Sequence, residues 1–165
     1  MNQAVQDAVN EQINIELSSA YVYLAMSAYF ENGNFPGVAK WLKHQAEEEL
    51  GHAMRLFEFM NDRGGRVVMK AIAEPAKDYG TLLEAFRKVL GHEQHVTASI
   101  HNLYALAVEH KDYPLQTHLH WFIDEQVEEE KSAGDIVSKL ELIGSHTPGL
   151  LMLDHQLGSR SGESH

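Results

Sequence analysis

The stretch from Val38 to Phe59, VAKWLKHQAEEELGHAMRLFEF, decides the fold, and its centre is the run Glu47-Glu48-Glu49-Leu50-Gly51-His52. Inward positions recur along it at steps of three and four residues, the period of one face of an α-helix. They are Val38, Leu42, Gln45, Glu49, His52, Leu56 and Phe59. Glu49 and His52 therefore share the buried face of the predicted helix.

Three other segments carry a row of inward positions with the same spacing. We call each such row a seam, and each seam contains a glutamate. The first comprises Val9, Ile13, Glu16, Ala20, Tyr23, Ser27 and Phe30. The next comprises Leu82, Phe86, Val89, Glu93, Val96, Ile100, Leu103 and Ala107. The last comprises Leu115, Leu119, Phe122, Gln126, Glu129, Ala133, Ile136, Leu140 and Ile143. Four such seams predict an all-α protein in which four long helices pack these faces together.

The bundle would bring four carboxylates, those of Glu16, Glu49, Glu93 and Glu129, to roughly the same depth in an apolar core. Burying a carboxylate without compensation costs several kcal/mol, so the group needs protons or cations. Two divalent cations would cancel four carboxylate charges, and His52 would add a neutral ligand. The alternative is a structural network of protonated or hydrogen-bonded glutamates.

The seams predict two sets of metal ligands that share Glu49 as a bridge. One set is Glu16, Glu49 and His52; the other is Glu49, Glu93 and Glu129, with Gln126 beside its open side. Oxygen ligands with one imidazole suit iron or manganese better than tetrahedral zinc. The second position has fewer strong ligands, so we expect it to bind more weakly, admit O2 and release its ion after oxidation.

Composition sets broader limits. The 165 residues suit one domain, predicted over residues 1–158, with a disordered tail over 159–165. The formal net charge of −11 argues against nucleic-acid binding, and no apolar run is long enough for a membrane span. Cysteine is absent, which excludes thiolate ligands. No secretory signal is visible, so a cytoplasmic location is expected.

Helix boundaries follow from breakers and caps. We expect a first helix over about 3–31 and a second that has Pro36 in its first turn and continues to the Gly64-Gly65 pair. Further helices are expected over about 81–110, from Asp112 to about Ile143, and from Thr147 to about Leu157. Asn34 is predicted to cap the second helix, and Thr81 with Glu84 to form a capping box on the third.

The connection over residues 65–80 predicts the topology. In extended form it reaches about 50 Å, more than the roughly 40 Å length of the helices. It can therefore cross the bundle from end to end. The other links between long helices are short, which predicts antiparallel hairpins. A four-helix bundle with one long crossover, here with a short fifth helix, is a ferritin-like fold.

Four motifs resemble those of bacterial and archaeal non-haem ferritins: Glu16, residues 47–52, Glu93 and residues 124–130, DEQVEEE. The resemblance extends over residues 1 to about 158. It implies iron storage and detoxification by a homo-oligomeric shell of twenty-four subunits. Each subunit would be a ferroxidase that oxidises Fe(II) with O2, or with H2O2, at an internal di-iron centre, and the shell would store ferric mineral.

The resemblance also implies roles for further residues. Glu48, Glu125 and Glu128, with Glu129, match the ligands of a third iron site; the alternative for these acidic residues is a solvated face. Tyr23 would hydrogen-bond a ligand or donate an electron, or else serve as a core aromatic. Haem is not expected, because Leu50 stands where bacterioferritins place their haem-ligating Met, and Glu129 replaces their second histidine.

Two rival functions are compatible with a di-metal bundle. A soluble di-iron oxidoreductase would act on a peroxide or an organic substrate, but the sequence contains no cysteine-rich electron-transfer domain. A shell or metal buffer without rapid oxidation would not need a complete ligand set. Particle size separates a storage shell from a small oxidoreductase.

Overall fold

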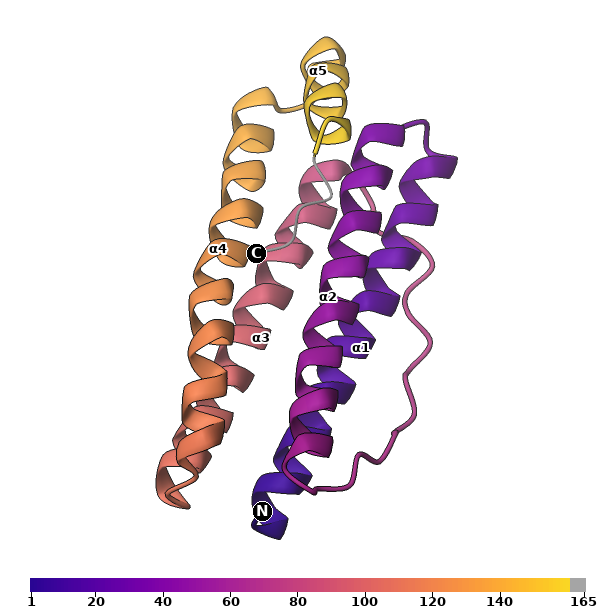
Figure 1. The fold of residues 1–165 in the computed structure, drawn as a ribbon. Coiled ribbons are helices and arrows are strands. Elements are labelled where there is room, and N and C mark those ends of the chain that lie inside the picture. Colours follow the sequence, from indigo (N-terminus) through magenta and orange to yellow (C-terminus); the bar gives the residue numbers. More distant parts are fainter. Residues whose placement is uncertain (161–165) are drawn as a thin grey trace.

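The computed structural model describes residues 1–160, which form five helices and no strand. The helices are α1 (Gln3–Asn32), α2 (Pro36–Asp62), α3 (Leu82–Glu109), α4 (Tyr113–Ile143) and α5 (Thr147–Gly158). Figure 1 shows α1 and α2 as one hairpin, α3 and α4 as a second, and α5 across one end of the bundle. The predicted ferritin-like four-helix bundle with a short fifth helix is confirmed.

The long crossover runs along the outside of α1 and contains no helix (Figure 1). Asn10 donates to the backbone carbonyl of Arg66 at 3.0 Å and accepts from the Val68 amide at 3.0 Å. Near the other end of the bundle, the Tyr29 hydroxyl donates to the carbonyl of Gly80 at 3.0 Å. These contacts lead the chain from one end of the bundle to the other before α3 begins.

Side chains cap α3 and α4 at the residues where the sequence predicts these helices to begin. Thr81 Oγ1 accepts from the Glu84 amide at 3.2 Å at the start of α3. Asp112 Oδ1 accepts from the Leu115 amide at 3.1 Å at the start of α4. Each acceptor satisfies one of the amides that a first helical turn leaves without a partner.

The predicted cap of α2 is wrong. Asn34 has a positive φ of 67° and belongs to the turn, and the residue at the N-cap position is Phe35, which makes no side-chain cap bond. The Val38 amide donates instead to Asp154 Oδ1 of α5 at 2.8 Å. A side chain from another helix therefore supplies the cap.

The buried core has two apolar halves separated by a polar layer. One half lies around Tyr23, Leu42 and Phe86, and the other around Ile13, Leu56 and Leu119. The sequence positions between the halves are where the four seam glutamates occur. The seams were wrong in detail at four positions, where the side chains are only half-buried: Ala20, Ser27, Phe59 and Ile143.

Of the predicted tail, Ser159 and Arg160 belong to the described residues and 161–165 lie outside them. Within residues 1–160, no helix is both long enough and apolar enough to cross a bilayer.

Candidate metal centre

Each of the four long helices contributes to the polar layer at mid-height of the bundle, because each seam keeps its glutamate on the core-facing side. The side chains are almost wholly buried. Their exposed fractions are 0% for Glu16, 0% for Glu49, 4% for His52, 1% for Glu93, 2% for Gln126 and 6% for Glu129. Such a concentration of buried carboxylates requires compensating protons or cations.

Glu16, Glu49 and His52 form the first potential ligand group, with one ligand atom from each lying within 4.8 Å of the others. His52 Nδ1 is 3.2 Å from Glu49 Oε2 and 3.7 Å from Glu16 Oε2. None of these three buried atoms has a hydrogen-bond partner within the described part of the chain. Three unsatisfied ligand atoms that face one another are an arrangement that a bound cation would satisfy.

Glu49, Glu93 and Glu129 form the second group, again within 4.8 Å. Glu49 belongs to both groups, which is the bridging position that the seams predict. Gln45 donates its amide hydrogens to Glu49 Oε1 at 3.2 Å and to Glu129 Oε2 at 2.5 Å. Gln45 therefore links two carboxylates of the second group from the side of α2.

Tyr23 and Gln126 both contact Glu93. The Tyr23 hydroxyl donates to Glu93 Oε1 at 2.5 Å. Gln126 Nε2 lies 3.2 Å from Glu93 Oε2 and 3.1 Å from Thr97 Oγ1. Gln126 thus directs its nitrogen toward Glu93, and both residues orient that carboxylate.

The three glutamates expected at a third site do not form one group. Glu125 is buried, and its Oε1 lies 3.9 Å from His52 Nε2; Glu125, His52 and Glu129 make a third potential ligand group. Glu48 pairs instead with Arg160 at 3.0 Å. Glu128 is exposed and belongs to none of the ligand groups found among residues 1–160.

Burial and mutual repulsion raise the pKa of most carboxylic acids in the layer. The pKa of Glu49 lies well above its ordinary value, because the side chain is buried and faces Glu93 and Glu16. Burial and the charge of Glu93 raise the pKa of Glu129 to about 8. Burial also raises the pKa of Glu93, although its bonds from Tyr23 and Gln126 oppose the shift.

Glu16 and His52 behave differently. Burial alone would raise the pKa of Glu16, but its interactions with His52, Glu49 and Gln12 outweigh burial and lower it. Burial alone would lower the pKa of His52, but its interactions with Glu16 and the charges of Glu129 and Glu125 together outweigh burial, so the pKa is raised. At neutral pH the layer is therefore a mixture of protonated and charged groups.

Sequence reasoning missed residues that contact this layer, among them Thr97, Gln12 and Arg160. Gln12 donates to Glu16 Oε1 at 3.1 Å, and a signal for it was present. A glutamine stands four residues before the inward glutamate in both α1 and α2, so Gln12 and Gln45 occupy equivalent positions. Arg160 was assigned to a disordered tail, and nothing in the local sequence indicated its contacts.

Comparison with known proteins agrees with this geometry. Residues 6–143 match the family model described as a ferritin-like domain. A bacterial non-heme ferritin of Bacteroides fragilis (strain 638R) is 40% identical over 160 residues, which covers 97% of this chain and 99% of that protein. A bacterial non-heme ferritin of Staphylococcus aureus (strain USA300) is 36% identical over 155 residues, 94% of this chain and 93% of that protein.

Solved structures are similar along almost the whole chain. An open pore ferritin of the hyperthermophilic archaeon Archaeoglobus fulgidus has a TM-score of 0.96 and 44% identity, covering 98% of this chain and 99% of that one. A structure described as a humanized archaeal ferritin has a TM-score of 0.98 and 42% identity, with 99% of each chain covered.

Proposed function

Since this chain belongs to the ferritin family, among its prokaryotic non-haem members, we propose that it stores iron and oxidises Fe(II) with O2 at the centre described above. Two Fe(II) ions would each give up one electron, and O2 would accept both with two protons to form H2O2. The oxidised iron would then move to a mineral inside a shell of subunits. In this account iron is the substrate.

The observation that carries the proposal is the unsatisfied trio of Glu16 Oε2, Glu49 Oε2 and His52 Nδ1. These atoms would hold one Fe(II), and Glu49, Glu93 and Glu129 would hold the second. Gln45 and Tyr23 keep the carboxylates of the second position in place through hydrogen bonds. Hard oxygen ligands and one imidazole stabilise iron in both oxidation states.

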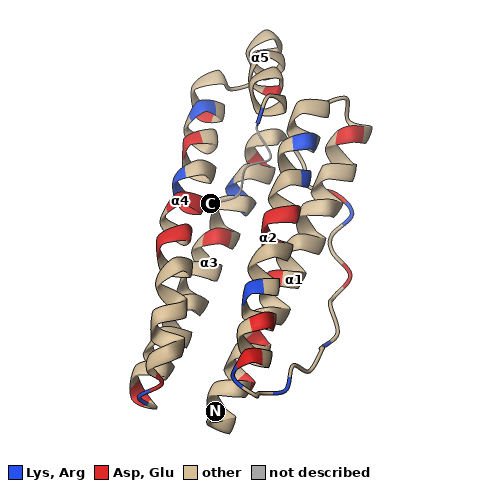
Figure 2. Ribbon diagram, viewed as in Figure 1, with Lys and Arg blue, Asp and Glu red and all other residues tan. Residues whose placement is uncertain are grey.

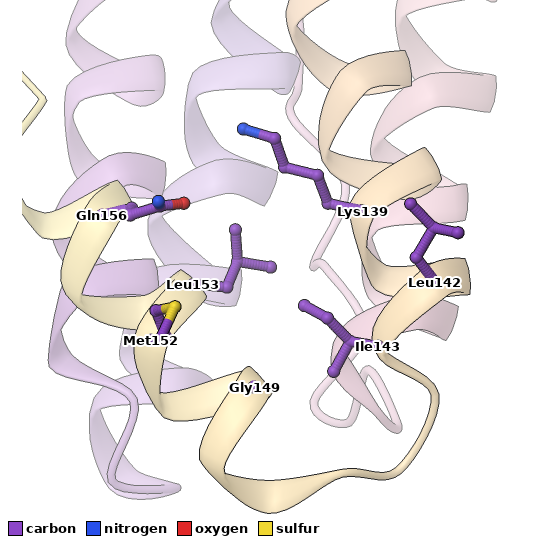
Figure 3. A pocket seen from close by; sticks show the side chains of 7 residues that line it. All are labelled: Lys139, Leu142, Ile143, Gly149, Met152, Leu153 and Gln156. Carbon is purple, nitrogen blue, oxygen red and sulfur yellow. The ribbon is translucent and has the colours of Figure 1, made fainter.

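A shell requires surfaces that subunits can cover. Residues 94–108 of α3 and 113–123 of α4 contain no Asp, Glu, Lys or Arg, and Figure 2 shows these stretches in tan next to the charged turn that joins the two helices. Tyr113 and Val108 are 68% and 50% exposed there. Apolar residues also line a groove between α4 and α5, which Figure 3 shows. Both surfaces support a homo-oligomer, proposed to contain twenty-four subunits.

The test of the function is addition of Fe(II) to the protein without oxygen, followed by mixing with O2. Oxidation that continues beyond two irons per chain, with soluble ferric mineral growing inside a large particle, is the expected result. Oxidation that stops at two irons per chain, on a small oligomer, would favour the di-iron oxidoreductase instead. Binding without rapid oxidation would favour a metal buffer.

Glu49→Ala tests the shared bridge. This variant should lose fast Fe(II) oxidation in stopped-flow mixing, because both ion positions lose a ligand. Glu47→Ala is the matched control, since Glu47 lies two residues away with 61% of its side chain exposed. Wild-type oxidation rates in Glu49→Ala would contradict the assignment.

A further inference from the structure

Arg160, the second residue after α5, lies against α2 beside the metal centre. Its Nη2 is 3.0 Å from Glu48 Oε1, and its Nη1 donates to the Trp41 carbonyl at 3.1 Å and to Gln45 Oε1 at 3.2 Å. The guanidinium also stacks on the Trp41 ring, 4.7 Å from its centroid. The forked guanidinium thus makes four contacts with three residues of one helix.

The Glu48 pair is largely shielded from solvent, with 12% of the Glu48 side chain and 21% of the Arg160 side chain exposed. Glu48 stands next to Glu49, and its charge contributes to the raised pKa of Glu129. The guanidinium therefore lies against the Glu48 carboxylate, one residue along the chain from the buried Glu49.

We propose that Arg160 is an internal competitor for cations at Glu48, which must leave that carboxylate before a metal ion can bind there. The proposal rests on the iron-binding function inferred above and adds a residue to it. Two positive groups at one carboxylate repel each other, so binding of the ion and of the guanidinium is mutually exclusive. The ion pair thereby weakens occupancy of the Glu48 side of the centre.

Gln45 extends the effect of Arg160 to the buried carboxylates. Arg160 binds the oxygen of the Gln45 amide, which leaves the amide nitrogen facing Glu49 and Glu129. Arg160 is therefore a positioning residue that acts through Gln45. When the guanidinium leaves Glu48, the amide loses the donor that holds its orientation, so an ion at Glu48 and the ions between Glu49 and Glu129 are coupled.

Calorimetric titration of the intact protein with Zn(II), which undergoes no oxidation, tests this competition. Arg160→Ala should tighten the weakest class of Zn(II) sites by about two- to fivefold, the range expected on losing a partly exposed ion pair. The gain should be absent when Glu48→Gln is the background. Arg87→Ala is the matched control. Arg87 forms an exposed ion pair with Glu141, with 3.3 Å between the two charged groups, and this pair lies outside the metal centre.

Trp41 gives a second readout that a purely structural role of Arg160 would not change. With Trp121→Phe, Trp41 is the remaining tryptophan, and Zn(II) should change its emission as the guanidinium leaves the ring. In the Arg160→Ala variant, Trp41 emission before any Zn(II) is added should already equal the emission of the Zn(II)-loaded protein that keeps Arg160. Zn(II) should then leave it unchanged. Arg160→Lys keeps the positive charge but not the forked guanidinium. Its Zn(II)-dependent change in Trp41 emission should be smaller than with Arg160 and larger than with Arg160→Ala.

Equal Zn(II) affinities for wild type and Arg160→Ala, together with Trp41 emission that Zn(II) does not alter, would overturn the proposal. That result would leave the proposed oxidation of Fe(II) untouched, because the titration involves no redox step. Conversely, failure of the protein to oxidise Fe(II) would refute the proposed function and leave the measured competition valid. The two failures are therefore distinguishable.

Discussion

At the scale of single residues, the carboxylates of the core must hold either protons or cations. The pKa of Glu129 is raised to about 8, and those of Glu49 and Glu93 are also raised, so protons compensate much of the charge when no metal is bound. A metal ion has to displace these protons. Metal affinity should therefore increase as pH rises, with protons released on binding.

The first prediction concerns the metal-free protein, whose stability should fall as pH rises from about 4.5 to about 8. Glu129 in the folded state keeps a proton that the unfolded chain loses near 4.5, so unfolding releases protons throughout this window. Glu49 and Glu93, with raised pKa values, act in the same direction. Glu16, with a lowered pKa, contributes stability that is lost only as pH falls below 4.5.

Calorimetry of the metal-free protein across this pH range checks the prediction, with a loss on the order of a few kcal/mol. Saturating Zn(II) should reverse the slope, and Glu129→Gln should reduce it. A metal-free protein whose melting temperature rose steadily from pH 5 to pH 8 would contradict the pKa directions.

The second prediction concerns Tyr23, whose hydroxyl donates to Glu93 at 2.5 Å. Tyr23→Phe removes a hydrogen bond to a charged ligand, so the pKa of Glu93 should rise further. Zn(II) binding at neutral pH should weaken by about tenfold, and Fe(II) oxidation should slow with it. Tyr21→Phe, at a side chain that is 51% exposed, is the control and should change neither quantity.

The buried glutamates were predictable because their positions follow from helical periodicity alone. Glu49 and His52 must share a face if the segment is one helix, whatever the remaining structure does. The Arg160 contacts could not be predicted, since they join residues 112 or more positions apart through packing of α5. Contacts between residues so far apart in the sequence do not produce a periodic pattern from which they could be predicted.

At the scale of the helices, α5 and α2 stabilise each other through Asp154. Its carboxylate accepts from the Val38 amide at 2.8 Å and supplies the cap that Phe35 cannot. Asp154→Ala should cost about 1 kcal/mol of unfolding free energy, the usual value of an N-cap, and should increase hydrogen exchange in α5. Asp154→Asn keeps an oxygen acceptor and should retain most of the stability; equal losses in both variants would contradict the capping role.

Substitution of Gly37 in α2 tests how closely α2 and α5 pack, with Gly134 in α4 as the control. A methyl group at Gly37 would overlap the backbone carbonyl of Asp154, so Gly37→Ala should displace α5 and lower the melting temperature. Gly134→Ala, where a methyl group meets nothing within 4 Å, should raise stability by about 0.5–1 kcal/mol through helix propensity. Thermal unfolding of both variants gives the comparison, and an unchanged α5 in Gly37→Ala would refute the close packing.

Local chemistry also predicted where most helices begin and end. Asp112 and Thr81 cap helices whose first turns follow them directly, so the signal lies within a few residues. Pro36 lies in the first turn of α2 as predicted, but the predicted cap, Asn34, was wrong, because the capping Asp154 lies 116 residues away from Val38. A capping side chain that comes from another helix can be identified only from the packed structure.

At the scale of the whole molecule, the apolar surface exceeds what an isolated chain needs. Leu142 and Met152 are 89% and 67% exposed, and they line the groove between α4 and α5 with Ile143 and Leu153 (Figure 3). An exposed apolar groove at one end of the bundle, in addition to the stretches 94–108 and 113–123 that carry no charged residue, indicates that other subunits cover parts of this chain. We expect a second copy of the chain to occupy the groove.

Leu142→Glu tests that expectation on the assembled particle. The new carboxylate would be buried without a partner at the contact between copies, so the shell should dissociate into smaller species in size-exclusion chromatography with light scattering. Leu142→Met keeps an apolar side chain of similar volume and should leave the particle intact. Circular dichroism should show the same helix content in both variants, because Leu142 lies outside the core of the subunit. A shell of unchanged mass in Leu142→Glu would show that this groove faces solvent in the particle, and assembly would then depend on the hairpin surface around Tyr113 and Val108.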